Sequence, residues 1–248
     1  HGESEYNRAM RERGADPMLR DALLTERGVA QAATARQTLS LLRLGLEARA
    51  GSGGWALLVS PLRRSLDTAA GMWPEAFAAE AEARVEVWPE LREVVSGCDD
   101  LGSSASALRR EYPQLGPQLA GLPEVWWTVP QSLQHLSGDG EGMRQAFMQD
   151  PVAFKEADEA AFQGRLDALI RRLAETPERL LVVVAHGDLI GHLTGRLGLI
   201  DDDDDDSDVD RSSVDKARAH PRGLWLQTGE CRVVKDLDLQ PQERSDAQ

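Results

Sequence analysis

Two His-Gly pairs stand at opposite ends of the chain, and both carry residue types that could do phosphate chemistry. His1-Gly2 opens the sequence, and His186-Gly187 directly follows a run of leucine, valine and alanine. An imidazole changes charge near neutral pH, so it can serve as a nucleophile, an acid or a base. Two histidines placed where a strand runs into a loop indicate a catalytic centre that handles phosphate.

Polar residues also follow two other apolar runs. Arg64 comes shortly after the run Trp55–Val59, and Glu93 comes shortly after the run at 85–88. In open α/β sheets, ligands bind beyond the carboxyl ends of the strands. We therefore expect Arg64, Glu93 and His186 to meet the start of the chain at one edge of one sheet.

The elements that must position these residues can be read from caps and apolar runs. Thr25 is predicted to cap a long helix, and Ser60 and Asp150 each precede a proline, which combines a helix cap with the residue favoured at the first helical position. The continuous leucine and valine of 180–185 predict a strand buried on both faces. The predicted strands are 55–59, 85–88, 180–185, 223–228 and 231–236, and the predicted helices are 26–50, 62–72, 188–197 and one that begins at 151.

Strands that alternate with helices predict an α/β domain over residues 1–240, with three α/β/α layers around a mostly parallel central sheet. Residues 97–149 are rich in Gly, Ser, Pro and Gln, and they predict an inserted irregular or helical lobe, or lid, beside the site. The aspartate-rich segment 201–222 lacks the glycine and the terminal glutamate of an EF-hand, so it predicts a disordered acidic loop. Residues 241–248 are polar and predict a loose tail.

Composition narrows the classes of partner. The net charge is −14, and aspartates between 201 and 210 contribute eight of those negative charges. An acidic chain without a basic stripe argues against nucleic acid and an anionic membrane, whereas a few arginines suffice for a small phosphorylated substrate. No apolar run approaches the roughly 20 residues of a membrane span. Cys98 and Cys231 have neither metal-ligand nor disulfide spacing, so we expect a cytoplasmic protein.

The order of the motifs resembles the histidine phosphatase superfamily, also called the phosphoglycerate mutase-like family. That family begins with a strand ending in Arg-His-Gly-Glu and continues through Asn, Leu-Thr-x-x-Gly, Ser-x-Leu-x-Arg, Leu-x-Glu and a late His-Gly. The corresponding segments here are His1-Gly2-Glu3-Ser4 with Asn7, Leu24-Thr25-Glu26-Arg27-Gly28, Ser60-Pro61-Leu62-Arg63-Arg64, Leu91-Arg92-Glu93 and His186-Gly187. The stretch at 91–113 also resembles an uncharacterised plant, fungal and algal branch of this family.

The resemblance implies a role for each matched residue. His1 would attack phosphorus as a neutral imidazole and form a phosphohistidine that water then hydrolyses. Arg64 would grip phosphoryl oxygens, His186 would be a second donor, and Glu93 would be the general acid and later the base. No metal or other cofactor is expected, because side chains supply the positive charge. The residues expected to complete the substrate-binding cradle are Asn7, Ser4 and the backbone of Gly187.

Three alternatives to a phosphomonoester phosphatase stay open. A mutase of this family carries an Arg-His-Tyr-Gly stretch soon after the acid glutamate, and residues 94–100 contain none. An inactive family member could act as a binding or regulatory module. A chain that begins with histidine could also chelate copper through its amine and imidazole. Copper oxygenases of that kind are β-sandwiches rich in tyrosine and usually disulfide-bonded, whereas this chain has 2 Tyr and 2 Cys.

The family has a strand and an arginine before the histidine that corresponds to His1, and both are expected to matter for activity. In the family, an arginine that contacts the phosphate precedes the nucleophilic histidine, at the end of a strand in the middle of the sheet. Here the sequence opens at His1. We expect the N-terminal strand of the domain to be missing, and a chain without that strand to be less stable and largely inactive.

Several residues to which no catalytic role is assigned have ordinary structural interpretations. Arg63 and Arg92 are predicted to be solvated, since arginine is mostly exposed in folded proteins. His192 lies on the helix after His186 and is predicted to pack or to lie at the surface. Trp126 and Trp127 are adjacent within 97–149 and are predicted to form the core of the lobe.

Overall fold

The computed structural model describes residues 1–50, 55–77, 84–136, 139–178, 180–199, 226 and 228–230, with the backbone alone described at 39–50 and 84. The predicted acidic loop 201–222, the strand 231–236 and the tail 241–248 lie outside these residues, as does most of the predicted strand 223–228.

The described sheet is parallel and has the order β2-β1-β3. Its strands are β1 (Trp55–Val59), β2 (Arg84–Val87) and β3 (Leu180–Val184). In the centre, Leu57 aligns with Val85 of β2 and with Val182 of β3. Because all three strands run in the same direction, the residues that follow them lie at one edge, as the sequence predicts.

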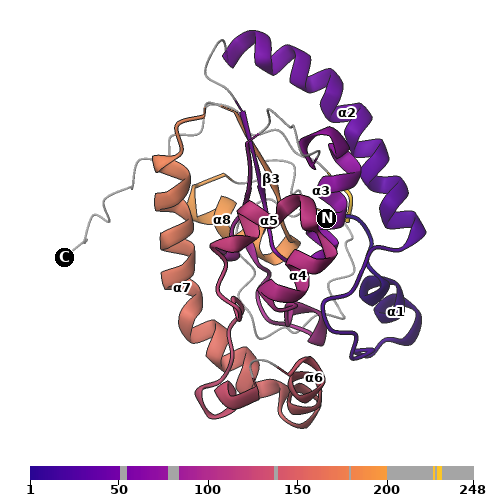
Figure 1. The fold of residues 1–248 in the computed structure, drawn as a ribbon, viewed down its shortest axis with the longest axis vertical. Coiled ribbons are helices and arrows are strands. Elements are labelled where there is room, and N and C mark those ends of the chain that lie inside the picture. The colour runs from indigo at the N-terminus through magenta and orange to yellow at the C-terminus, as the bar shows by residue number, and fades with distance from the viewer. Residues whose placement is uncertain are drawn as a thin grey trace, which may run out of the picture.

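Helices cover both faces of this sheet, which confirms the predicted α/β fold class with three layers (Figure 1). Leu57 and Val59 of β1 face the layer of α2 (Glu26–Ala50) and α3 (Arg63–Met72). Ala56 and Leu58, one residue out of phase, face the layer of α7 (Pro151–Glu175) and α8 (Gly187–Arg196). The alternation of side chains along β1 thus divides the core into two halves. This architecture differs from the β-sandwich of the copper-binding alternative.

Caps begin two of the long helices where the sequence predicts them. The backbone N–H of Gly28 donates to Thr25 Oγ1 over 3.0 Å at the start of α2. The N–H of Ala153 donates to Asp150 Oδ1 over 3.1 Å, and a proline occupies the first position of α7. In each case the cap satisfies an N–H group that has no partner within the helix.

The start of α3 corrects the prediction that Ser60 caps a helix beginning at residue 62. The helix begins at Arg63, and its N-cap is Leu62, which makes no side-chain capping bond. The hydroxyl of Ser60 accepts from the backbone N–H of Leu62 over 3.3 Å, and it also lies 2.7 Å from Nε2 of His186. Ser60 therefore contacts both the turn before α3 and the residue that follows β3, and the local pattern shows only the first of these contacts.

The strand β3 corrects a second prediction. Its first four residues are half-buried, and Val184 alone in the strand is buried, although the run of leucine and valine predicted burial on both faces. Its pairing explains part of the difference, because β3 pairs with β1 on one side and with no second strand among the described residues. Composition identified the strand correctly but not its exposure.

The segment at 97–149 is a lobe with more helix than its composition suggests. Figure 1 shows α6 at the lower end of the molecule. Trp126 and Trp127 are buried in the lobe as predicted, and Trp126 Nε1 donates to the carbonyl of Ser103 over 2.8 Å. The helical elements of the lobe are η4 (Cys98–Asp100), α4 (Ala105–Glu111), η5 (Pro113–Leu115), α5 (Gly116–Ala120), η6 (Gln131–Leu136) and α6 (Gly140–Gln149). The remaining described helical elements are α1 (Glu5–Arg13), η2 (Pro74–Phe77) and η3 (Pro89–Leu91).

Leu58 tests how much the α7 and α8 layer contributes to stability, because its side chain is fully buried in that half of the core. Leu58→Ala should lower the free energy of unfolding by about 2–5 kcal/mol, through lost burial and the cavity left behind. Urea unfolding with an unchanged m-value measures this. The exposed Val152 on α7 is the control, and Val152→Ala should change stability by less than about 0.5 kcal/mol. Equal effects of the two substitutions would contradict the layer assignment.

Candidate active site

His1 lies at the carboxyl end of β3. Its backbone nitrogen donates to the carbonyl of Ala185 over 3.1 Å, and its carbonyl accepts from the N–H of Gly229 over 2.7 Å. The backbone N–H of Gly2 donates to Thr68 Oγ1 of α3 over 2.9 Å. These bonds tie the start of the chain to both β3 and α3.

Glycine is required where the start of the chain crosses the beginning of α2. A Cβ on Gly2 would come within 2.5 Å of the carbonyl oxygen of Gly28, and a Cβ on Gly28 would come within 2.1 Å of the carbonyl oxygen of Glu3. Side chains at these positions would force the two backbone segments apart. The glycines of the His-Gly and Leu-Thr-x-x-Gly motifs therefore set the position of His1.

The partners of the His1 ring define its tautomer. Nδ1 lies 2.7 Å from the carbonyl oxygen of Gly2, which can accept a hydrogen bond but cannot donate one. Nε of Arg64 donates to Nε2 over 3.3 Å, and a guanidinium has no acceptor. The proton therefore lies on Nδ1, and Nε2 carries the lone pair. This is the neutral imidazole that an attack on phosphorus requires.

Arg64 is a buried cation held by two adjacent carboxylates. Its side chain is 2% exposed, with Nη2 2.8 Å from Asp100 Oδ1 and Nη1 3.3 Å from Asp99 Oδ2. Burial alone would lower the pKa of Arg64, but the charges of Asp99 and Asp100 raise it, so the guanidinium stays charged. Burial, and then the neighbouring charge of Asp100, raise the pKa of Asp99 well above its usual range.

Sequence reasoning missed both aspartates. Asp100 also accepts hydrogen bonds at Oδ2 from the backbone N–H groups of Ser96 and Gly97, over 2.8 and 3.0 Å. The sequence does contain an Asp-Asp pair a few residues after Glu93. The neighbouring residues, however, do not indicate that this pair contacts Arg64, which lies 35 residues before Asp99.

His186 lies beside His1, with the ring centroids 5.0 Å apart. It is 1% exposed, and its Nε2 is 2.7 Å from Ser60 Oγ and 3.3 Å from Ser65 Oγ. Burial, and then the positive charge of Arg64, lower the pKa of His186 well below its usual range. The ring is therefore neutral near pH 7. The serine hydroxyls are polar groups of the site that the sequence analysis did not assign.

Glu93 joins the site from the segment that follows β2. Its carboxylate accepts from the backbone N–H groups of Asp188 and Leu189, over 3.2 and 3.0 Å, at the start of α8. Burial, and then the charges of Asp188 and Asp100, raise the pKa of Glu93 to about 8. A carboxyl group that keeps its proton near pH 7 can act as a general acid.

The three residues expected to bind substrate have different surroundings. Gly187 is the first residue of α8, where backbone N–H groups lack helical partners and favour anions. Asn7 Oδ1 accepts from the backbone N–H and the hydroxyl of Ser4, over 3.0 and 2.9 Å, in the capping box of α1. Ser4 is fully buried. The structure thus assigns their oxygens to a helix cap, and substrate binding by these residues stays a prediction.

Arg92 corrects one prediction of the sequence analysis, and His192 supports another. Arg92 was predicted to be solvated, but its side chain is 11% exposed, and Nη2 donates to Thr128 Oγ1 over 2.8 Å. The buried network around Asp158, which the sequence does not reveal, accounts for the error. His192 packs as predicted, with its ring centroid 4.7 Å from that of Phe162.

Among the described residues, no group of three or more His, Cys, Asp or Glu side chains could hold a metal ion. Within the same part of the chain, none of the helices is long and apolar enough to cross a membrane.

The first part of the chain matches a known protein family. A model of the histidine phosphatase superfamily (branch 1) matches residues 1–146, which include His1, Arg64 and Glu93. The chain belongs to the histidine phosphatase superfamily. The family match confirms the resemblance drawn from the order of the motifs.

Solved structures and curated proteins were compared as well. The chain is 22% identical to a structure described as mycobacterial hydrolase 1, with 79% of this chain and 77% of that chain covered and a TM-score of 0.37. It is 20% identical to the native structure of mycobacterial glucosyl-3-phosphoglycerate phosphatase, with 79% and 76% covered and a TM-score of 0.39. No curated protein matches the chain.

The raised pKa of Glu93 predicts that Glu93→Gln stabilises the folded protein increasingly as the pH rises. Between about 4.5 and about 8, the folded state holds a proton on Glu93 that the unfolded state has lost, so wild-type stability falls across this window. Glutamine does not ionise, and the advantage of Glu93→Gln in urea unfolding should grow from the lower to the higher pH. Glu175→Gln, at an exposed position on α7, is the control. An advantage that shrinks with rising pH would contradict the protonated state of Glu93.

Proposed function

We propose that this histidine phosphatase family member is a phosphomonoester phosphatase that forms a phosphohistidine on His1. The observation that carries the proposal is the pair of contacts made by the His1 ring. Nδ1 is bonded to the carbonyl of Gly2 over 2.7 Å, and Nε2 lies 3.3 Å from Nε of Arg64. The lone pair of His1 Nε2 therefore points toward Arg64, the cation that would hold the phosphoryl group.

The first step is an in-line displacement at phosphorus. The lone pair of His1 Nε2 forms the N–P bond as the bond between phosphorus and the ester oxygen breaks. The carboxyl proton of Glu93 passes to the departing alkoxide, so the alcohol leaves neutral. In the second step, the Glu93 carboxylate takes a proton from water as that water attacks phosphorus. Inorganic phosphate leaves, and both His1 and protonated Glu93 are restored.

The surrounding charges suit a small phosphorylated substrate. Arg64 supplies a fixed positive charge, and the bond from Nη2 to Asp100 Oδ1 over 2.8 Å holds its guanidinium in one orientation. His186 and the N–H of Gly187 would add donors, while Asn7 and Ser4 would shape the loop that follows His1. A preorganised set of donors stabilises the charge that develops on the phosphoryl oxygens.

Hydrolysis is preferred to mutase chemistry on the residues after Glu93. A mutase must keep its phosphoryl group away from water and hold a phosphorylated acid for the return transfer. Residues 94–100 carry Asp99 and Asp100 and no arginine or histidine that could hold a second anionic group. Release of phosphate from p-nitrophenyl phosphate supports hydrolysis, and turnover of 3-phosphoglycerate without net phosphate release would support the mutase.

Replacing the nucleophile should abolish turnover. His1→Asn should lower kcat for a phosphate monoester by about 10³-fold or more, because asparagine has no ring nitrogen that can take the phosphoryl group. His135→Asn is the matched control, because His135 is exposed in η6 and should affect kcat little. The rate of phosphate release measures both variants. A His1→Asn protein with near wild-type kcat would exclude the phosphohistidine step.

The proton on Glu93 predicts the pH dependence of the reaction. For an alkyl phosphate, kcat/KM should fall as the pH rises through about 8, because Glu93 then loses the proton that the leaving alkoxide needs. Glu93→Gln should lower kcat/KM for that substrate by about 10²–10⁴-fold and remove this limb of the profile. A limb that persists in Glu93→Gln would assign the titration to another group.

A further inference from the structure

We infer that Asp158 and Arg165, two buried residues of α7, position Glu93 as the general acid. These two residues and their contacts to the segment at 89–95 are here called the α7 clamp. The inference rests on the proposed phosphatase function and adds two positioning residues that lie outside all five sequence motifs.

Asp158 binds the main chain just beyond the acid. Its carboxylate is fully buried, and Oδ2 accepts from the backbone N–H of Val95 over 3.0 Å. Oδ1 accepts from Thr128 Oγ1 over 2.8 Å and from Arg92 Nη2 over 3.4 Å. The residue two positions after Glu93 is therefore fixed to α7.

Arg165 binds backbone carbonyl groups in the short segment that ends at Glu93. Its side chain is 4% exposed, and Nη2 donates both to the carbonyl of Glu93 and to Asp158 Oδ2, over 3.4 Å in each case. Nη1 donates to the carbonyl of Glu90 over 3.3 Å and also to that of Arg92. The planar fork of a guanidinium fixes the direction of these bonds, which an ammonium group does not reproduce.

The α7 helix connects this clamp to the other group that holds Glu93. Phe162 of α7 packs against His192 of α8, and Leu166 and Leu169 are buried in the core shared with Leu189 of α8. The Glu93 carboxylate in turn accepts from backbone N–H groups at the start of α8. The main chain of the acid is thus held by α7, and its carboxylate is held by α8.

Stability alone does not explain why the charged side chains of Asp158 and Arg165 are buried. Removing charged groups from water is unfavourable, and a buried ion pair often gives little more stability than apolar residues of similar size. Burial, and then the neighbouring charge of Arg92, lower the pKa of Arg165 to about 10, so this cation sits where charge is disfavoured. Three carbonyl contacts within one short segment account for its presence, because they fix the backbone that carries the acid.

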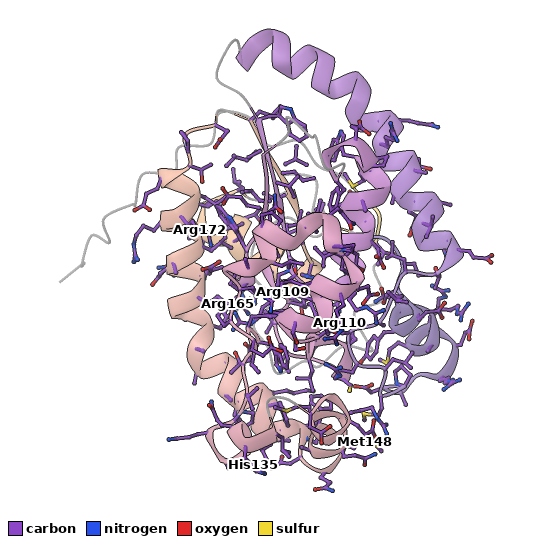
Figure 2. The ribbon with its side chains drawn as sticks, viewed as in Figure 1. Arg109, Arg110, His135, Met148, Arg165 and Arg172 are labelled. Atoms are coloured by element: carbon purple, nitrogen blue, oxygen red, sulfur yellow. The ribbon has the colours of Figure 1, made fainter. Side chains whose placement is uncertain are left out.

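Two of the arginines on α7, Arg165 and Arg172, offer a matched comparison. Figure 2 labels Arg165 and Arg172 beside this helix. Arg172 reaches side chains instead of the main chain, with Nη1 3.0 Å from Glu90 Oε2 and its guanidinium carbon 4.0 Å from the centre of the Trp88 ring. Arg172→Lys removes an arginine from the same helix but keeps a positive charge for Glu90 and all the carbonyl contacts of Arg165, so we expect Glu93 to keep its position.

The leaving group of the substrate separates positioning of the acid from general structure. An alkyl phosphate needs a proton on its departing oxygen, whereas p-nitrophenolate leaves readily without one. Arg165→Lys should lower kcat/KM for the alkyl phosphate by about 10²-fold, since a displacement of about 1 Å has that effect. Its kcat/KM for p-nitrophenyl phosphate should fall by less than about threefold. This ratio reports phosphoryl transfer to His1 and not the later hydrolysis, in which Glu93 serves as a base.

Three further variants complete the experiment, and thermal melts verify that each is folded. Glu93→Gln should show the same dependence on the leaving group as Arg165→Lys, and Arg172→Lys should show none. Thr128→Val removes one hydrogen bond to Asp158, and it should lower kcat/KM for the alkyl phosphate relative to p-nitrophenyl phosphate by less than Arg165→Lys does. This milder variant tests the inference if Arg165→Lys does not fold. Equal losses on both substrates would overturn the inference alone. No phosphate release from either substrate by a wild type that carries the N-terminal strand would overturn the proposed function and the inference with it.

Discussion

The hydrogen bond from Nδ1 of His1 to the carbonyl of Gly2 leaves Nε2 as the ring nitrogen with a lone pair, the atom at which the proposed nucleophile would react. It fixes the proton on Nδ1, and the donor at Arg64 then meets the lone pair on Nε2. The bond depends on a backbone path that glycine alone permits, because Gly2 and Gly28 approach too closely for a Cβ on either. The two glycines thereby determine which ring nitrogen of His1 carries the proton.

A second constraint is the concentration of carboxyl groups around one guanidinium. Glu93, Asp99 and Asp100 share the neighbourhood of Arg64. Burial, and then the charge of Asp100, raises the pKa of Asp99, while burial, and then the charges of Asp188 and Asp100, raises the pKa of Glu93. Burial and these charges keep a proton on Glu93 near pH 7, where an isolated glutamate would be ionised. The same effect lowers the stability of the fold above that range, because the protein must fold around a carboxyl group that resists ionisation.

The sequence predicted the parts of the site that depend on local pattern and order. Thr25 and Asp150 cap their helices as expected, and Trp55–Val59 has the bounds of the predicted strand. Ser60 was assigned to a helix start, but it binds His186 from a strand end that lies 126 residues away in the sequence. The partners of Arg64 and the α7 clamp were missed for the same reason, since pairing between distant buried charges leaves no periodic signal in the sequence. Propensity, spacing and motif order selected the groups proposed to react, whereas tertiary contacts determine their ionisation and orientation.

The central claim concerns one nitrogen atom, and phosphorus NMR of the protein trapped during turnover of a phosphate monoester tests it most directly. Phosphohistidines substituted on the two ring nitrogens are different chemical species, and digestion of the trapped protein locates the modified residue. The geometry predicts phosphorus bound to Nε2 of His1, the atom that faces Arg64. Phosphorus on Nδ1, phosphorus on His186, or steady turnover with no phosphorylated protein would contradict the account.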